Sequence, residues 1–169
     1  MDDGAADGAD GADGADGADD ADGIGRGGVL FYHSVGTPRG DSYGRTISRH
    51  RLRQDVEAFL AEGYRIVDVP TIAASGGAGE IALTFDDGYE SFYADVLPVL
   101  EALEVPATVY VHTAAVGSDG HVDADQLDEL FAHDLVTVGN HTRTHPYLDR
   151  IDDLERLEEE IVGARDWYE

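Results

Sequence analysis

Several residue types are missing from this chain of 169 residues. Cysteine is absent, which excludes a disulfide framework and a thiolate metal site. Lysine is absent too, so all 11 basic residues are arginines, against 36 acidic residues, and the net charge is −25. No apolar run approaches the length of a transmembrane helix, so we expect no membrane-spanning segment.

The acidic excess extends over the whole chain. The first 22 residues carry nine Asp and no basic residue, and the remainder still has 27 acidic residues against 11 arginines. Such charge opposes compact folding by self-repulsion, which salt screens. Together with the missing lysine, it favours an origin in an extreme halophile over an ordinary acidic protein. It also counts against nucleic acids and membrane surfaces as partners.

The chain divides into two regions. Residues 1–28 consist mainly of a Gly-Ala-Asp repeat that has no apolar mass to bury, and we expect a disordered, self-repelling tail there. Residues 29–169 have the composition of a single folded domain. The N-terminus lacks the basic and apolar segments of a signal peptide, so a cytoplasmic location is the default expectation.

Short apolar runs alternate with helical patterns in the second region. We expect helices over residues 48–62, 91–103, 125–133 and 151–168, and five strands, over residues 29–32, 64–69, 81–85, 107–111 and 135–138. The runs at 29–32 and 81–85 read as buried strands. Strands alternating with helices predict a parallel α/β sheet or barrel.

The last helix is expected to be amphipathic. Glu155, Glu158, Glu159 and Glu160 are predicted to be mostly solvated. The residues predicted to face inward are Ile151, Leu154, Leu157, Ile161, Ala164 and Tyr168.

Two polar motifs each follow a predicted strand. Asp86 and Asp87 end the run at 81–85, and His141 and His145 follow the run at 135–138. One Asp and two His can hold a divalent metal and leave a position free for water. On a helical turn, His141 and His145 would share a face and converge on one ion. The second Asp is then a candidate proton acceptor.

Each motif also has a simpler explanation. Asp-Asp-Gly at 86–88 can be a polar turn before a helix, and the two histidines can be ordinary surface residues. Adjacent carboxylates can also hold magnesium for phosphotransfer, but two imidazoles favour a borderline metal such as zinc. The occurrence of both motifs behind strands of one small domain favours the metal site.

The two motifs resemble those of the polysaccharide deacetylases, the NodB homology domain of carbohydrate esterase family four. Thr-Phe-Asp-Asp-Gly at 84–88 matches the first family motif, and His-Thr-Arg-Thr-His at 141–145 matches the second. The resemblance implies a partial (β/α) barrel and hydrolysis of N-acetyl, or alternatively O-acetyl, groups on a carbohydrate. It also implies Asp86 as catalytic base and Asp87, His141 and His145 as ligands of a divalent metal, with zinc first.

The chain departs from the family pattern near its end. The Arg and Pro-Tyr segment and the late Leu-x-x-His, which carries the general acid, are missing, so we expect the domain to be incomplete at its C-terminus. Tyr32-His33 resembles the N-terminal pair of a circularly permuted branch, which makes His33 the candidate acid. His33 can equally be a packed histidine at the edge of the core. The alternative function is a catalytically incomplete remnant that binds metal or glycan.

The other histidines have weaker claims to function. We expect His112 to be structural although it ends a strand, and His50, His121 and His133 to face solvent. Oligomeric state cannot be inferred from these patterns.

Overall fold

The structure is a computed structural model that describes residues 26–36 and 46–168. The predicted tail at 1–28 therefore falls almost entirely outside the described residues and stays a prediction. Within the described ranges, no helix has both the length and the apolar character needed to cross a lipid bilayer.

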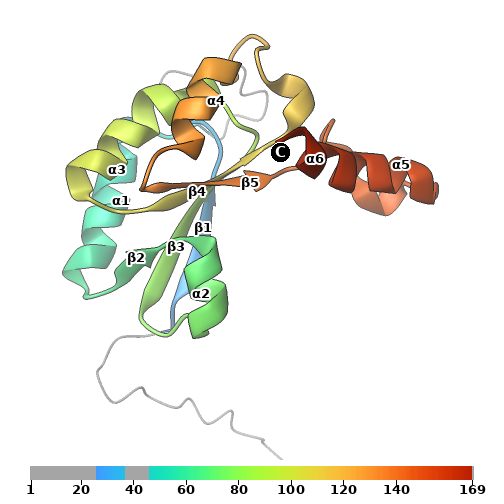
Figure 1. Ribbon diagram of the computed structural model, residues 1–169. Coiled ribbons are helices and arrows are strands. Elements are labelled where there is room, and N and C mark those ends of the chain that lie inside the picture. The colour runs from blue at the N-terminus through green and yellow to red at the C-terminus, as the bar shows by residue number, and fades with distance from the viewer. Residues whose placement is uncertain (1–25, 37–45, 169) are drawn as a thin grey trace, which may run out of the picture.

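The centre of the fold is a parallel sheet of five strands, as expected, which curls strongly from one edge to the other (Figure 1). The central strand β3 pairs with β1 along one edge and with β2 and β4 along different halves of the other edge, while β5 continues from β4. The strands span Gly28–Tyr32 (β1), Arg65–Val67 (β2), Glu80–Phe85 (β3), Ala107–Val111 (β4) and Val136–Asn140 (β5).

The helices follow the predicted positions with one addition. Their bounds are Arg49–Ala61 (α1), Val69–Ser75 (α2), Leu97–Leu103 (α3), Ala124–Phe131 (α4), Leu154–Glu158 (α5) and Ala164–Trp167 (α6). Helix α2 is not among the predicted helices. It begins at an N-cap formed by Asp68, whose side chain accepts a hydrogen bond from Thr71 N. Its seven residues are too few for a helical period to be recognised in the sequence.

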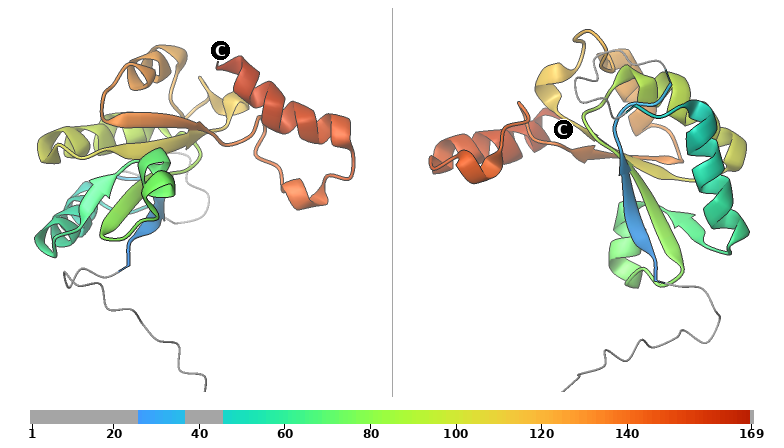
Figure 2. Two further views of the ribbon diagram at one scale, coloured as in Figure 1. Left: turned by 60° about the horizontal axis from the view of Figure 1, so that its bottom comes forward. Right: turned by 180° about the vertical axis from the view of Figure 1, so that it is seen from behind.

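The main core lies between the sheet and the helices α1, α3 and α4 (Figure 2). Every residue of β3 is buried, which confirms the strand predicted from the run at 81–85. Leu52 and Val56, one turn apart on α1, are fully buried in this core. Helix α2 instead begins near Thr108 of β4, whose Oγ1 accepts a hydrogen bond from Val69 N.

Strand β1 is not the buried strand that its composition predicts. Val29 is 52% exposed and Phe31 is 66% exposed. The exposed residues alternate along the strand, so one face of β1 is uncovered, and because β1 pairs only with β3 among the described residues, one of its edges is open as well. Four consecutive apolar residues do not distinguish a strand covered on both faces from an edge strand.

The last helical segment also differs from its prediction. It starts at Leu154 rather than at residue 151, and a π-helical turn at Glu159–Gly163 separates α5 from α6. Leu154 is 79% exposed, Ile161 is also exposed, and Glu160, predicted to be solvated, is only 6% exposed. Leu157 and Ala164 keep the inward positions predicted for them, and within the π turn Glu160 rather than Ile161 lies on the buried side.

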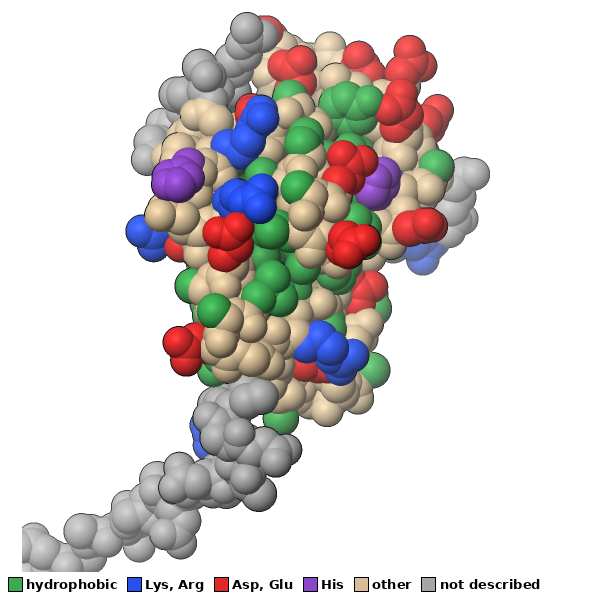
Figure 3. Space-filling view, turned by 90° about the vertical axis from the view of Figure 1, so that its left-hand side faces the viewer, with side chains coloured by type: hydrophobic (Ala, Val, Ile, Leu, Met, Phe, Trp, Pro, Cys, Tyr) green, Lys and Arg blue, Asp and Glu red, His purple; other side chains and the backbone are tan. Residues whose placement is uncertain are grey.

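Acidic and basic side chains lie side by side on the face that carries α1 and α3 (Figure 3). On this face Arg49 pairs with Asp95, and Arg53 Nε lies 2.7 Å from Glu57 Oε1. Arginines therefore neutralise part of the local negative charge, although exposed pairs of this kind contribute little stability each.

Candidate metal centre

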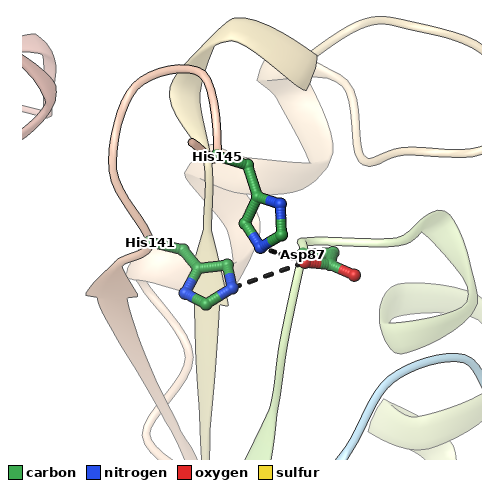
Figure 4. A group of neighbouring side chains, drawn as sticks. All are labelled: Asp87, His141 and His145. Carbon is green, nitrogen blue, oxygen red and sulfur yellow. Dashed lines mark ion pairs between the residues drawn. The ribbon is translucent and has the colours of Figure 1, made fainter. Parts of the chain in front are cut away.

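Asp87, His141 and His145 form a cluster at the carboxyl ends of the strands (Figure 4). Asp87 follows β3 by two residues and His141 follows β5 directly. Asp87 Oδ1 lies 3.4 Å from Nε2 of His141 and 3.4 Å from Nε2 of His145. One ligand atom from each residue falls within 4.8 Å of the others, so the three side chains can converge on one ion.

Asp87 has the properties of a metal ligand that lacks its metal. The side chain is 8% exposed, and Oδ1 is buried without a hydrogen-bond partner. Burial acts to raise the pKa of Asp87, but the contact with His141 and the positive charge of both imidazoles outweigh it and lower the pKa to about 2. A buried, ionised oxygen without a partner is costly, and a divalent cation between Asp87 and the two imidazoles would satisfy it. The donor set, one carboxylate and two imidazoles, fits zinc or a similar ion.

The backbone after β3 turns sharply to present the carboxylate. Asp87 has φ 74° and Gly88 has φ 71°, both in the left-handed region. A Cβ on Gly88 would lie 2.8 Å from Val111 Cγ1, so this position also requires the absence of a side chain. Glycine at position 88 thus allows the chain to turn sharply beside the carboxylate of Asp87.

The two histidines do not lie on the helical turn that their spacing suggests. Residues 141–147 form an irregular loop in which Thr142 has φ 69° and His145 has φ 58°. Thr142 Oγ1 accepts a hydrogen bond from His145 N at 3.0 Å, and Asn140 Oδ1 accepts one from Thr142 N at 2.7 Å. These side-chain contacts bring the two imidazoles together by a compact turn instead of helical periodicity.

All five predicted site residues line one cavity of about 370 Å³. Asp86 lies beside the cluster without belonging to it, and His33 enters the cavity from the end of β1. Burial raises the pKa of Asp86, against the opposing charges of His141 and His33. The residues around the cavity are Phe31, His33, Asp86, Asp87, His141, His145, Pro146 and Tyr147.

His112 lies behind the cluster, outside the set of residues that line this cavity. Its ring centroid is 5.5 Å from that of His145, and its Nδ1 is buried without a hydrogen-bond partner. Burial, helped by the charges of His121 and His145, lowers the pKa of His112 to about 4, so the ring is neutral at pH 7 and packs against its neighbours.

Only one of the three histidines predicted to face solvent is exposed. His50 is exposed, whereas His121 and His133 are half-buried. His121 stacks on Tyr89 with ring centroids 5.0 Å apart, and His133 Nε2 lies 3.3 Å from Glu101 Oε1. These contacts are long-range and leave no local pattern in the sequence.

Two features near the site were not predicted from the sequence. Phe31 and Tyr147 are exposed aromatic side chains at the cavity wall. Glu160 accepts hydrogen bonds from Thr144, next to His145. A signal for Glu160 was available: it lies four residues before the buried Ala164 and three after Leu157, a spacing that places it on the inner face.

A model of the polysaccharide deacetylase family matches residues 73–169, which include Asp86, Asp87, His141 and His145. Over 104 residues the chain is 32% identical to a poly-beta-1,6-N-acetyl-D-glucosamine N-deacetylase of Escherichia coli K12, covering 58% of this chain and 15% of that protein. Over 90 residues it is 37% identical to a chitooligosaccharide deacetylase of a Bradyrhizobium strain, covering 53% of this chain and 39% of that protein.

Several solved structures have a fold similar to that of this chain. IcaB from Ammonifex degensii superimposes with a TM-score of 0.68 at 27% identity, over 82% of this chain and 66% of that one. A polysaccharide deacetylase from Bacillus cereus superimposes with a TM-score of 0.72 at 23% identity, over 83% of this chain and 46% of that one. The chain thus spans less than half of each of the two curated relatives described. With the family model matching more than half of its length, this chain belongs to the polysaccharide deacetylase family.

Proposed function

We propose that this protein is a metal-dependent deacetylase that hydrolyses acetyl groups on an amino-sugar polymer, with zinc as the metal. The observation that carries the proposal is Asp87 Oδ1, which is buried without a hydrogen-bond partner and lies 3.4 Å from Nε2 of both His141 and His145. An arrangement of this kind is costly in the free protein and is satisfied by a cation.

Asp87, His141 and His145 would hold the metal, and the remaining wall of the cavity would receive the substrate. A divalent ion in such a site polarises a carbonyl oxygen and lowers the pKa of water. Asp86 is adjacent to a ligand and faces the same cavity, which suits a base that accepts a proton from the attacking water. The pKa of Asp86 is raised toward the neutral pH range, and a general base is most effective when its pKa lies near the working pH.

His33 is our candidate for the acid that protonates the leaving amine. It lines the cavity from the end of β1, separate in the sequence from the base on β3. An imidazole nitrogen can carry a proton and pass it to a leaving group, which is the task of a general acid. The nitrogen of an acetamide leaves only after it gains a proton, so a donor is required.

The names of the relatives favour N-acetylated sugars as substrates. Poly-beta-1,6-N-acetyl-D-glucosamine and chitooligosaccharides, the substrates in those names, both carry acetamide groups. The exposed rings of Phe31 and Tyr147 at the cavity wall provide apolar surfaces of the kind that sugar rings contact.

The test is turnover of an N-acetylglucosamine oligomer by the full chain, in high salt, with added zinc or cobalt. We expect acetate release by the wild type and a loss of about 100-fold or more in Asp86→Asn, with zinc binding retained. His50→Ala, an exposed histidine outside the cavity, is the control and should keep full activity. Zinc binding without any turnover would instead favour a catalytically incomplete, metal-binding remnant.

A further inference from the structure

Glu160 is the one buried acidic side chain in the described part of the C-terminal helical segment. It lies on the π-helical turn Glu159–Gly163. Its Oε2 accepts a hydrogen bond from Thr144 N at 2.8 Å, and its Oε1 accepts one from Thr144 Oγ1 at 2.5 Å. Both carboxylate oxygens of Glu160 thus accept hydrogen bonds from Thr144, the residue that precedes His145.

The backbone of the same turn holds the loop at two further points. The carbonyl of Glu160 accepts a hydrogen bond from Arg143 N at 2.9 Å. The carbonyl of Ile161 accepts one from Asn140 Nδ2 at 2.8 Å. The π-helical turn therefore contacts the end of β5 at residue 140 and the following loop at residues 143 and 144.

The loop needs such support because its own conformation is unfavourable. Thr142 and His145 adopt positive φ angles, which side-chain-bearing residues rarely adopt unless the surrounding structure imposes them. His145 is itself half exposed at its side chain, so local packing alone does not hold it. Hydrogen bonds that Thr144 donates to the buried carboxylate of Glu160 supply a fixed point immediately before His145.

We propose that Glu160 is a positioning residue of the metal centre, which fixes the loop of residues 140–145 so that the imidazoles of His141 and His145 meet Asp87. The inference rests on the proposed function, in which these three residues bind a divalent ion. Glu160 touches neither metal nor substrate; it acts through Thr144. Groups that orient metal ligands in this way commonly change metal affinity by about 10–100-fold when removed.

The neighbouring Glu159 offers a matched control. It belongs to the same helical turn and carries the same charge, but it is exposed and pairs with the Arg143 side chain on the surface. Glu160→Ala should weaken zinc binding about 10–100-fold and alter the visible absorption spectrum of bound cobalt. Glu160→Gln keeps an acceptor for Thr144 N and should restore most of the affinity. Glu159→Ala should bind zinc within about twofold of the wild type.

The measurements are zinc titration and cobalt spectra of the full chain, below the unfolding temperature of each variant. If Glu160→Ala does not fold, Thr144→Val removes the hydroxyl contact from the other side and decides the matter in the same way. Unchanged zinc affinity and an unchanged cobalt spectrum in a folded variant would overturn the inference alone. A wild type that binds no zinc would overturn the proposed function and this inference together.

Discussion

Asp87 combines burial, ionisation and the absence of a hydrogen-bond partner at one oxygen atom. These properties oppose one another in the free protein, because an ionised group loses hydration when it is buried. The two nearby imidazoles relieve this only in part, since their Nε2 atoms lie 3.4 Å away. Metal binding and stability should therefore be linked through this residue.

Zinc should stabilise the folded protein, and Asp87→Asn should abolish the effect. At a zinc concentration about 100 times the dissociation constant, binding adds about 2.7 kcal/mol to the free energy of unfolding. Thermal unfolding with and without zinc measures this. His50→Ala is the control and should respond as the wild type does, whereas a full zinc response in Asp87→Asn would contradict the ligand assignment.

Gly88→Ala should destabilise the protein by about 1–3 kcal/mol. The added Cβ would meet Val111 Cγ1 at 2.8 Å, and the backbone would keep an unfavourable φ of 71°. Gly28→Ala is the matched control, because nothing lies within 4 Å of a Cβ built there. Urea denaturation should show a clear loss for the first variant and a change near zero for the second.

At the scale of elements, the contact between the π-helical turn Glu159–Gly163 and the loop that follows β5 joins two segments that sequence patterns treat separately. Burial acts to raise the pKa of Glu160, but the hydrogen bonds from Thr144 outweigh it and hold the pKa below its ordinary value of 4.5. A hydrogen bond with the backbone of Arg143 and the positive charge of Arg156 act in the same direction. A lowered pKa in the folded state means that the ionised form stabilises the fold.

This contact should make stability depend on pH in a defined direction. The contribution of ionised Glu160 is fully present above pH 4.5 and is lost as the pH falls through its lower folded value. The difference in free energy of unfolding between the wild type and Glu160→Gln should be about 1 kcal/mol at pH 7 and shrink below pH 4. Urea denaturation across pH measures it. Glu159→Gln should show no comparable difference at pH 7, and a constant gap for Glu160→Gln would contradict the argument.

Across the whole molecule, the net charge of −25 dominates the response to salt. The structure pairs several arginines with carboxylates on the face of α1, but 36 acidic residues outnumber 11 basic ones. The repulsion that remains is spread over the surface, where counterions screen it.

The folded state should therefore gain stability as salt rises. Between 0.1 M and 1 M KCl the screening length falls from about 10 Å to about 3 Å, and we expect the melting temperature to rise by about 5 °C or more. Thermal unfolding followed by circular dichroism tests this, with sucrose as a control for effects that do not depend on charge. A melting temperature that is flat or falls with KCl would argue against adaptation to high salt.

Much of the fold follows from short-range patterns. The strand at β3, the capped helix at α1 and the order of strands and helices agree with the sequence because local apolar runs and caps specify them. The exposure of β1, the missing prediction of α2 and the rotated face of the last helical segment do not follow from such patterns. The exposure of β1 depends on which segments cover it, whereas α2 is too short to show a helical period and a π turn shifts the buried face of the last segment.

The sequence by itself indicated the acidic and histidine side chains that line the cavity, but not its aromatic ones. Asp86, Asp87, His141 and His33 all follow strands, and the carboxyl ends of parallel strands meet at one edge of a sheet. Only the tertiary structure decided how the ligands are held. The turn at residues 142–145 also has local contacts of Asn140 and Thr142, but the hydrogen bonds from Thr144 to Glu160 join residues 16 positions apart, which no local preference encodes.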